Sequence, residues 1–178
     1  MSGAPPDGRH CGDCTLCCKI MAIEARAKPA GVWCPDCRPG RGCAIYADRP
    51  AECRDFRCLW LSDGRLDDRW KPSRSKLVLT TSEDGIEVRC DPGFPDAWRK
   101  APFDGVIRGW AATGAGIDVT VLVLVGRKTI LVASDRDFDL GVVAPDEQIL
   151  REFEGGRLVD VRVGKAPGGD RGAARPPP

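Results

Sequence analysis

The sequence predicts an α+β protein in which an irregular, cysteine-rich lobe packs on a small, mainly antiparallel sheet with one or two helices. Nine of the ten cysteines lie between residues 11 and 58, in a region broken by glycine and proline. The region that follows alternates β-branched runs with helical patterns. The hydrophobic fraction is 42% of 178 residues, which is enough for one core. These observations predict a lobe stabilised by metal ions or disulfide bonds, next to a region that folds around its own hydrophobic core.

Composition divides the chain into four parts. Residues 1–10 and 165–178 are rich in glycine and proline and cannot bury apolar surface, so we expect both ends to be disordered. Residues 11–72 form the cysteine-cluster region, and residues 73–164 form the α+β region.

The cysteine-cluster region is expected to contain only short elements. One turn of helix is predicted around Cys14 to Cys18 with Asp13 as its N-cap, which would place Cys14, Cys17 and Cys18 on one helical face. A second short helix is expected to begin near Pro50 and to carry Cys53. The prolines and glycines between these two helices predict a loop.

The α+β region shows strand and helix patterns in alternation. Strands are predicted over residues 76–81, 86–90, 118–125, 129–133 and 158–163, with turns at residues 83–85 and 126–127. Helices are predicted over residues 98–112 and 145–153, the second because acidic residues occupy its first turn. We expect Cys90, which stands alone at a strand end, to behave as a small buried hydrophobe.

Charge and hydropathy restrict the partners and the compartment. The net charge is +1, which argues against a nucleic-acid partner. The longest apolar stretch, 119–125, is far shorter than the ~20 residues of a membrane-spanning helix. Because the first residues lack a hydrophobic signal segment, we expect a cytoplasmic protein, in which clustered cysteines bind metal or react more often than they form disulfides.

The cysteine spacing predicts a metal site. A Cys-x-x-Cys turn directs two sulfurs at one ion, and the chain has three such spacings before residue 38. All-sulfur ligation suits zinc and iron–sulfur centres alike, a 4Fe–4S cluster included. Nine thiols allow two four-sulfur sites, or one site with bystanders. The predicted ligands are Cys11, Cys14, Cys17, Cys18, Cys34, Cys37, Cys43, Cys53 and Cys58.

Other side chains were weighed beside the cysteines. Five arginines interspersed among them, Arg38, Arg41, Arg49, Arg54 and Arg57, would offset thiolate charge or form a solvated face. The aromatic residues Trp33, Tyr46, Phe56 and Trp60 are expected to shield the site from water. His10 is expected to be solvated. Asp135, Asp137 and Asp139 resemble a calcium loop, but the position of the glycine favours a loop that leaves a strand.

The ordered blocks of the first region resemble a known family. They are Cys11-x-x-Cys14-x-x-Cys17-Cys18, then Gly42-Cys43-Ala-Ile-Tyr46, then Arg49-Pro50, and then Cys53-Arg54-x-Phe56-x-Cys58-x-Trp60. They are similar to the YkgJ-like cysteine-cluster family, a zinc- or iron-chelating CxxCxxCC domain. The resemblance covers residues 11–60 and implies metal chelation by the seven motif cysteines, with Cys34 and Cys37 as extras. A related cluster in flagellin lysine methylases implies an iron–sulfur enzyme as an alternative.

Three functional hypotheses follow from the sequence. The leading one is a metal-binding protein that holds zinc or an iron–sulfur centre, is not itself an enzyme, and offers a surface for a protein partner. The second is an iron–sulfur-dependent enzyme or a maturation accessory protein. The third is a thiol redox sensor in which Cys17 and Cys18 react on oxidation.

Overall fold

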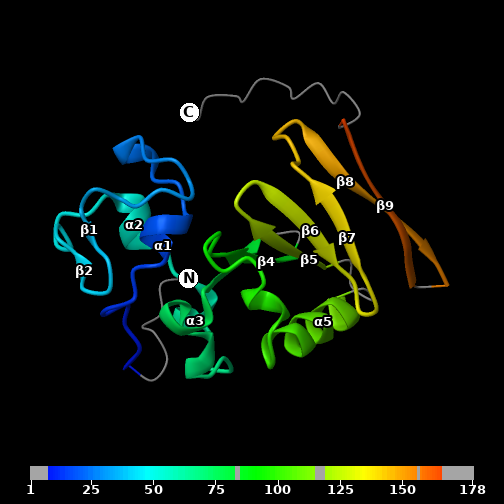
Figure 1. The fold of residues 1–178 in the computed structure, drawn as a ribbon, viewed down its shortest axis with the longest axis horizontal. Coiled ribbons are helices and arrows are strands. Elements are labelled where there is room, and N and C mark those ends of the chain that lie inside the picture. Colours follow the sequence, from blue (N-terminus) through cyan, green and yellow to red (C-terminus); the bar gives the residue numbers. More distant parts are fainter. Residues whose placement is uncertain (1–7, 83–84, 115–118, 156, 166–178) are drawn as a thin grey trace, which may run out of the picture.

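The computed structural model describes residues 8–82, 85–114, 119–155 and 157–165. The first seven residues, the centre of the predicted turn at 83–85 and the predicted tail beyond residue 165 lie outside these ranges. The protein is α+β, as predicted. Figure 1 shows the cysteine-cluster region on one side, a central sheet, and a separate β-hairpin on the other side.

The cysteine-cluster region is built from short elements and long connections. Its helices are α1 (Cys17–Ile20), η2 (Glu24–Arg26), α2 (Ala51–Asp55), α3 (Leu59–Ser62), η3 (Asp68–Trp70) and α4 (Pro72–Ser75). Two short strands, β1 (Cys37–Arg38) and β2 (Gly42–Cys43), pair antiparallel. The predicted helix at Pro50 is confirmed as α2, with Pro50 at its N-cap position.

The central sheet of the described residues has the strand order β3-β4-β5-β6-β7. Its strands are β3 (Leu77–Ser82), β4 (Gly85–Cys90), β5 (Thr120–Val125), β6 (Lys128–Val132) and β7 (Asp137–Gly141). All neighbours are antiparallel except β4 and β5, which are parallel. Parallel neighbours require a crossover, and η4 (Ala97–Arg99) and α5 (Phe103–Gly114) lie in it. Gly85 permits the close β4–β5 approach, since a Cβ there would lie 1.9 Å from the Thr120 carbonyl oxygen.

One face of the sheet carries the main core. Alternate residues of β3, β4, β5 and β6 point to this face, as the two-residue period of a strand requires. They pack against Ile107 and Ala111 of α5 and against Trp98, which is only 1% exposed. Trp60 and Leu61 of α3 belong to the same cluster, and Cys11 and Cys58 contact it. The cysteine-cluster region therefore rests on the main core at two of its thiols.

The opposite face of the sheet is covered at two separate places. Val78 of β3, which is fully buried, packs against Leu16 and Ile20 around α1. On the β6 side, Leu131 packs against Leu158 of the hairpin strand β9. The first contact fixes α1, and with it Cys17 and Cys18, on the sheet.

The prediction of a second helix in the α+β region, over residues 145–153, is wrong. This segment is the strand β8 (Glu147–Glu154), which pairs antiparallel with β9 (Arg157–Lys165). The β9 segment is strongly β-branched, and pairing with it over eight registered positions outweighs the helix-forming acidic start. Arg151 of β8 also donates to the Thr120 hydroxyl at 2.5 Å, which attaches the hairpin to the central sheet.

The other predicted elements of the α+β region are confirmed with shifted ends, and the strands β1, β2 and β7 were not predicted. The predicted helix at 98–112 begins only at Phe103, and Trp98 lies in η4 before it. The segment expected to be a loop around Asp137 is the edge strand β7. Its carboxylates form ion pairs, Asp137 with Arg99 at 2.7 Å and Asp139 with Lys128 at 2.5 Å. They are engaged with basic side chains, as residues of an ordinary edge strand often are.

Candidate metal centre

The cysteine-cluster region folds around a cavity of about 270 Å³. Eight of the nine predicted ligands line it: Cys11, Cys14, Cys17, Cys18, Cys34, Cys43, Cys53 and Cys58. The ninth, Cys37, lies beside them, because its N–H donates to the Cys34 carbonyl at 3.0 Å and it faces Cys43 across the β1–β2 ladder. The structure therefore brings together all nine clustered cysteines, whereas Cys90 is buried in the main core. The predicted role of Cys90 as a small hydrophobe is confirmed by its 1% exposure.

The segment that opens the cysteine motif is a turn followed by a short helix. The Cys14 N–H donates to the Cys11 carbonyl at 2.8 Å, and α1 begins only at Cys17. The predicted turn of helix therefore begins three residues later than expected, and Leu16 rather than Asp13 occupies its N-cap position. The Asp13 carboxylate instead accepts from Lys71 Nζ at 2.7 Å, so an ion pair takes the side chain that the cap would need.

The second Cys-x-x-Cys pair is held against the first by backbone hydrogen bonds. The Cys34 N–H donates to the Cys18 carbonyl at 3.0 Å, and the Cys37 N–H donates to the Cys34 carbonyl at 3.0 Å. Cys37 then lies directly opposite Cys43 in the β1–β2 ladder. The buried Thr15 hydroxyl accepts from the Gly40 N–H at 3.1 Å and closes the β1–β2 loop onto the start of α1.

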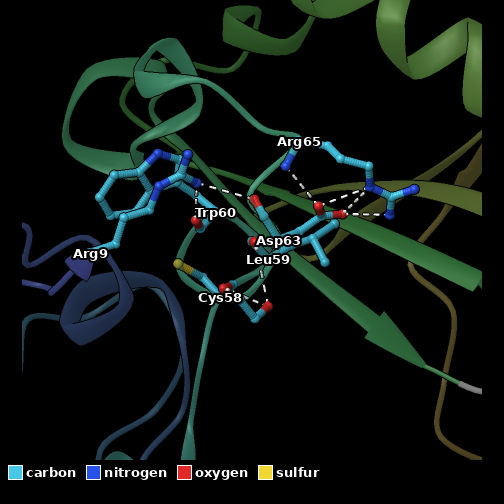
Figure 2. Close-up of polar contacts among 7 residues, drawn as sticks. Arg9, Cys58, Leu59, Trp60, Asp63 and Arg65 are labelled. Atoms are coloured by element: carbon cyan, nitrogen blue, oxygen red, sulfur yellow. Dashed lines mark hydrogen bonds and ion pairs between the residues drawn. The ribbon is translucent and has the colours of Figure 1, made fainter. Parts of the chain in front are cut away.

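Cys53 and Cys58 come from the two helices that follow. Cys53 lies in α2, and Cys58 occupies the N-cap position of α3, where its carbonyl accepts from the Leu61 N–H at 2.9 Å. Arg9 stabilises α3 from outside, because its guanidinium donates to the Trp60 carbonyl at 2.7 Å and lies 5.2 Å from the centre of the Trp60 ring (Figure 2).

Burial and mutual contact set the protonation of the thiols. Burial raises the pKa of Cys11 and Cys53, and it raises the pKa of Cys58 to about 11. The adjacent pair differs. A hydrogen bond from the Cys17 thiol lowers the pKa of Cys18, and the same contact raises the pKa of Cys17.

Two cations lie among the cysteines. Arg49, one of the five arginines noted in the sequence, acts on Cys11 and lowers its pKa against the effect of burial. Lys28 was missed by sequence reasoning. It is 5% exposed, its ammonium donates to the Met21 and Lys19 carbonyls, and its charge lowers the pKa of Cys18. No sequence motif marks Lys28; only the folding of 19–28 back on α1 reveals it.

Two buried N–H groups on the cavity lining lack a hydrogen-bond acceptor among the described residues. They are Trp60 Nε1 and Arg49 Nε. A buried donor without an acceptor costs about 1–3 kcal/mol, so native proteins rarely keep one without a reason. Thiolate sulfur bound to a metal is an anionic acceptor that would satisfy them. This feature and the eight lining thiols fit a thiolate-held metal centre.

Three of the four aromatic residues expected to shield the site lie beside the thiols, but Tyr46 is 54% exposed, so only Phe56 and Trp60 are placed to exclude water. Tyr46, Phe56 and Trp60 line the cavity, and the Arg49 guanidinium lies 4.0 Å from the centre of the Tyr46 ring. Trp33 is 40% exposed and is not among the lining residues. His10 is exposed, as expected.

The thiols are gathered but do not form a closed ligand set. Across the described ranges, no three histidine, cysteine, aspartate or glutamate side chains stand close enough together to hold a metal ion. The donor chemistry fits a metal, but the sulfurs as placed do not converge on one point. Coupling of metal binding to local ordering is usual in small cysteine-rich domains.

Comparison with known proteins gives no further identification. None of the helices in the described part of the chain is long and apolar enough to cross a bilayer. No family model, no curated protein and no solved structure matches the chain.

Proposed function

We propose that this chain is a metal-binding protein that holds zinc or an iron–sulfur centre through its cysteine cluster. The observation that carries the proposal is the single cavity lined by eight thiols. Thiolates are the ligands that zinc and iron–sulfur clusters share, and a structural site of either kind takes about four of them. The resemblance to the YkgJ-like family supports the same proposal.

The fold explains why such a centre would be needed. The cysteine-cluster region has helices of three to five residues and a two-residue ladder, so secondary structure contributes little to its order. Its apolar contacts with the rest of the protein come from α1 on one face and from the segment 59–70 on the other, whereas the β1–β2 ladder belongs to neither of these apolar clusters. A bound metal would connect α1, the β1–β2 ladder, α2 and α3 and would hold the region together.

The cysteine ligands do not favour zinc over an iron–sulfur centre. The metal content and colour of the purified protein distinguish the three functional hypotheses. A brown protein with iron and acid-labile sulfide would support the iron–sulfur alternative, including an enzyme or an accessory role. A colourless protein with zinc would support a structural centre. A metal-free protein whose Cys17 and Cys18 oxidise reversibly would support the redox sensor.

The test is the metal content of protein purified without oxygen. We expect the wild type to contain zinc or iron, and we expect Cys14→Ser and Cys53→Ser to lose at least half of it, because a serine hydroxyl is a far poorer ligand than a thiolate. Elemental analysis of the wild type and both variants checks this expectation.

The matched control is Cys90→Ala, which removes a buried thiol outside the cysteine-cluster region. This variant should keep the wild-type metal content. A wild type that is folded and free of metal would contradict the proposal, and so would full metal content in both serine variants.

A further inference from the structure

One half of the cysteine cluster consists of Cys11, Cys14, Cys17 and Cys58. The Cys11–Cys14 turn brings the first two together, and Cys11 and Cys58 both contact the main core beside Trp60. Electrostatic interactions link the same set. The thiol charges that act on Cys58 come from Cys14 and Cys11, and Cys17 also interacts with these two.

The other half consists of Cys18, Cys34, Cys37, Cys43 and Cys53. Backbone hydrogen bonds join Cys18 to Cys34 and Cys34 to Cys37, each at 3.0 Å, and Cys37 faces Cys43 across the ladder. The thiol charges that act on Cys53 come from Cys18, Cys34 and Cys43, all of this half.

The boundary between the two halves passes between Cys17 and Cys18. Both lie in α1, where successive side chains leave the axis about 100° apart, because a turn contains 3.6 residues. The strongest interaction of Cys17 and of Cys18 is with each other; beyond that pair, Cys17 interacts with Cys11 and Cys14, and Cys18 interacts with Cys37 and with Cys11. Consecutive cysteines in a helix can thus serve two separate centres, which explains the adjacent pair.

A cation accompanies each half. Arg49 acts on Cys11 in the first half, and Lys28 acts on Cys18 in the second. A zinc ion with four thiolates carries a net charge of about −2 by addition of its ligand charges, so each centre would need a nearby positive charge.

We infer that the cysteine cluster holds two metal ions, one among Cys11, Cys14, Cys17 and Cys58 and one among Cys18, Cys34, Cys37, Cys43 and Cys53. The inference rests on the proposed function and adds the number and the division of the sites. The first set has the four sulfurs that a tetrahedral site takes, and the second has one more than four.

The experiment is native mass spectrometry of metal-free wild type titrated with Zn²⁺ under reducing, oxygen-free conditions. Saturation at two zinc ions per chain is expected. Saturation at one ion would overturn the two-site inference and leave the proposed function standing, whereas no binding at all would remove both. The number of bound zinc ions is measured on the wild type alone, so the result does not depend on whether a variant folds.

Two variants then test the division. Cys58→Ser, and the double variant Cys34→Ser with Cys37→Ser, should each keep one of the two zinc ions, and Cys90→Ala should keep both. Alkylation mapping provides a measurement without any substitution: in wild type loaded with two zinc ions, Cys11, Cys14, Cys17 and Cys58 should be protected, and the one clustered cysteine that reacts should belong to the second set. Reaction of a cysteine of the first set in the loaded protein would overturn the division.

Discussion

At the scale of single residues, the site depends on contacts that the cysteine motif does not reveal. The motif predicts which thiols gather, because Cys-x-x-Cys turns and Cys53 on a short helix bring their sulfurs inward. It does not predict Lys28, which reaches the cluster only because residues 19–28 fold back over α1. It does not predict the unpaired indole N–H of Trp60 either, since a hydrogen-bond partner is a property of the three-dimensional surroundings.

Trp60→Phe tests whether the indole N–H serves the bound centre. The change removes the donor and keeps an aromatic ring. We expect the increase in unfolding free energy that metal provides to fall by about 1 kcal/mol, because one hydrogen bond to the centre is lost. Denaturant unfolding of metal-loaded and metal-free protein measures this increase, and the difference between the two states cancels the altered ring packing.

Trp98→Phe is the matched control, since Trp98 is buried in the main core and does not line the cavity. It should destabilise the loaded and the metal-free protein equally. An equal effect of Trp60→Phe on both states would show that its N–H has no part in the metal centre.

At the scale of elements, the sequence predicted correctly those strands that a local residue pattern marks. It failed for segments whose structure depends on a partner far away in the sequence. The strands β3 to β6 follow β-branched runs, and the sequence located all four to within a few residues. Residues 145–153 carry a local helix signal, but the structure forms β8 because β9 is available as a partner. The start of α1 shifted for the same reason, since Asp13 pairs with Lys71, 58 residues away.

The hairpin of β8 and β9 makes a prediction of its own. Leu158 is 9% exposed and packs against Leu131 on the sheet. Leu158→Ala should lower the free energy of unfolding by about 2–4 kcal/mol through lost burial and the cavity left behind, with no change in metal content. Chemical denaturation and elemental analysis check both parts.

Leu150 of the same hairpin is 50% exposed, so Leu150→Ala should change stability by less than about 0.5 kcal/mol. If Leu158→Ala were as harmless as this control, the hairpin would not be packed on the sheet as described. If it lost metal, the hairpin and the cysteine-cluster region would be coupled.

At the scale of the whole molecule, the sheet is a platform for the cysteine cluster. α1 is fixed by Val78 on one face, and α3 with Cys58 is fixed by the main core on the other. The sequence predicted the α+β class and the gathering of nine thiols. It could not predict that the cluster spans both faces at the β3 edge, because that arrangement depends on contacts between residues about 60 positions apart.

The central claim is that cysteine sulfur holds a metal in this protein, and X-ray absorption spectroscopy of the metal in anaerobically purified protein tests it most directly. We predict a first shell of sulfur alone, with metal–sulfur distances of about 2.3 Å. A shell dominated by oxygen or nitrogen, or folded protein without bound zinc or iron, would contradict the account.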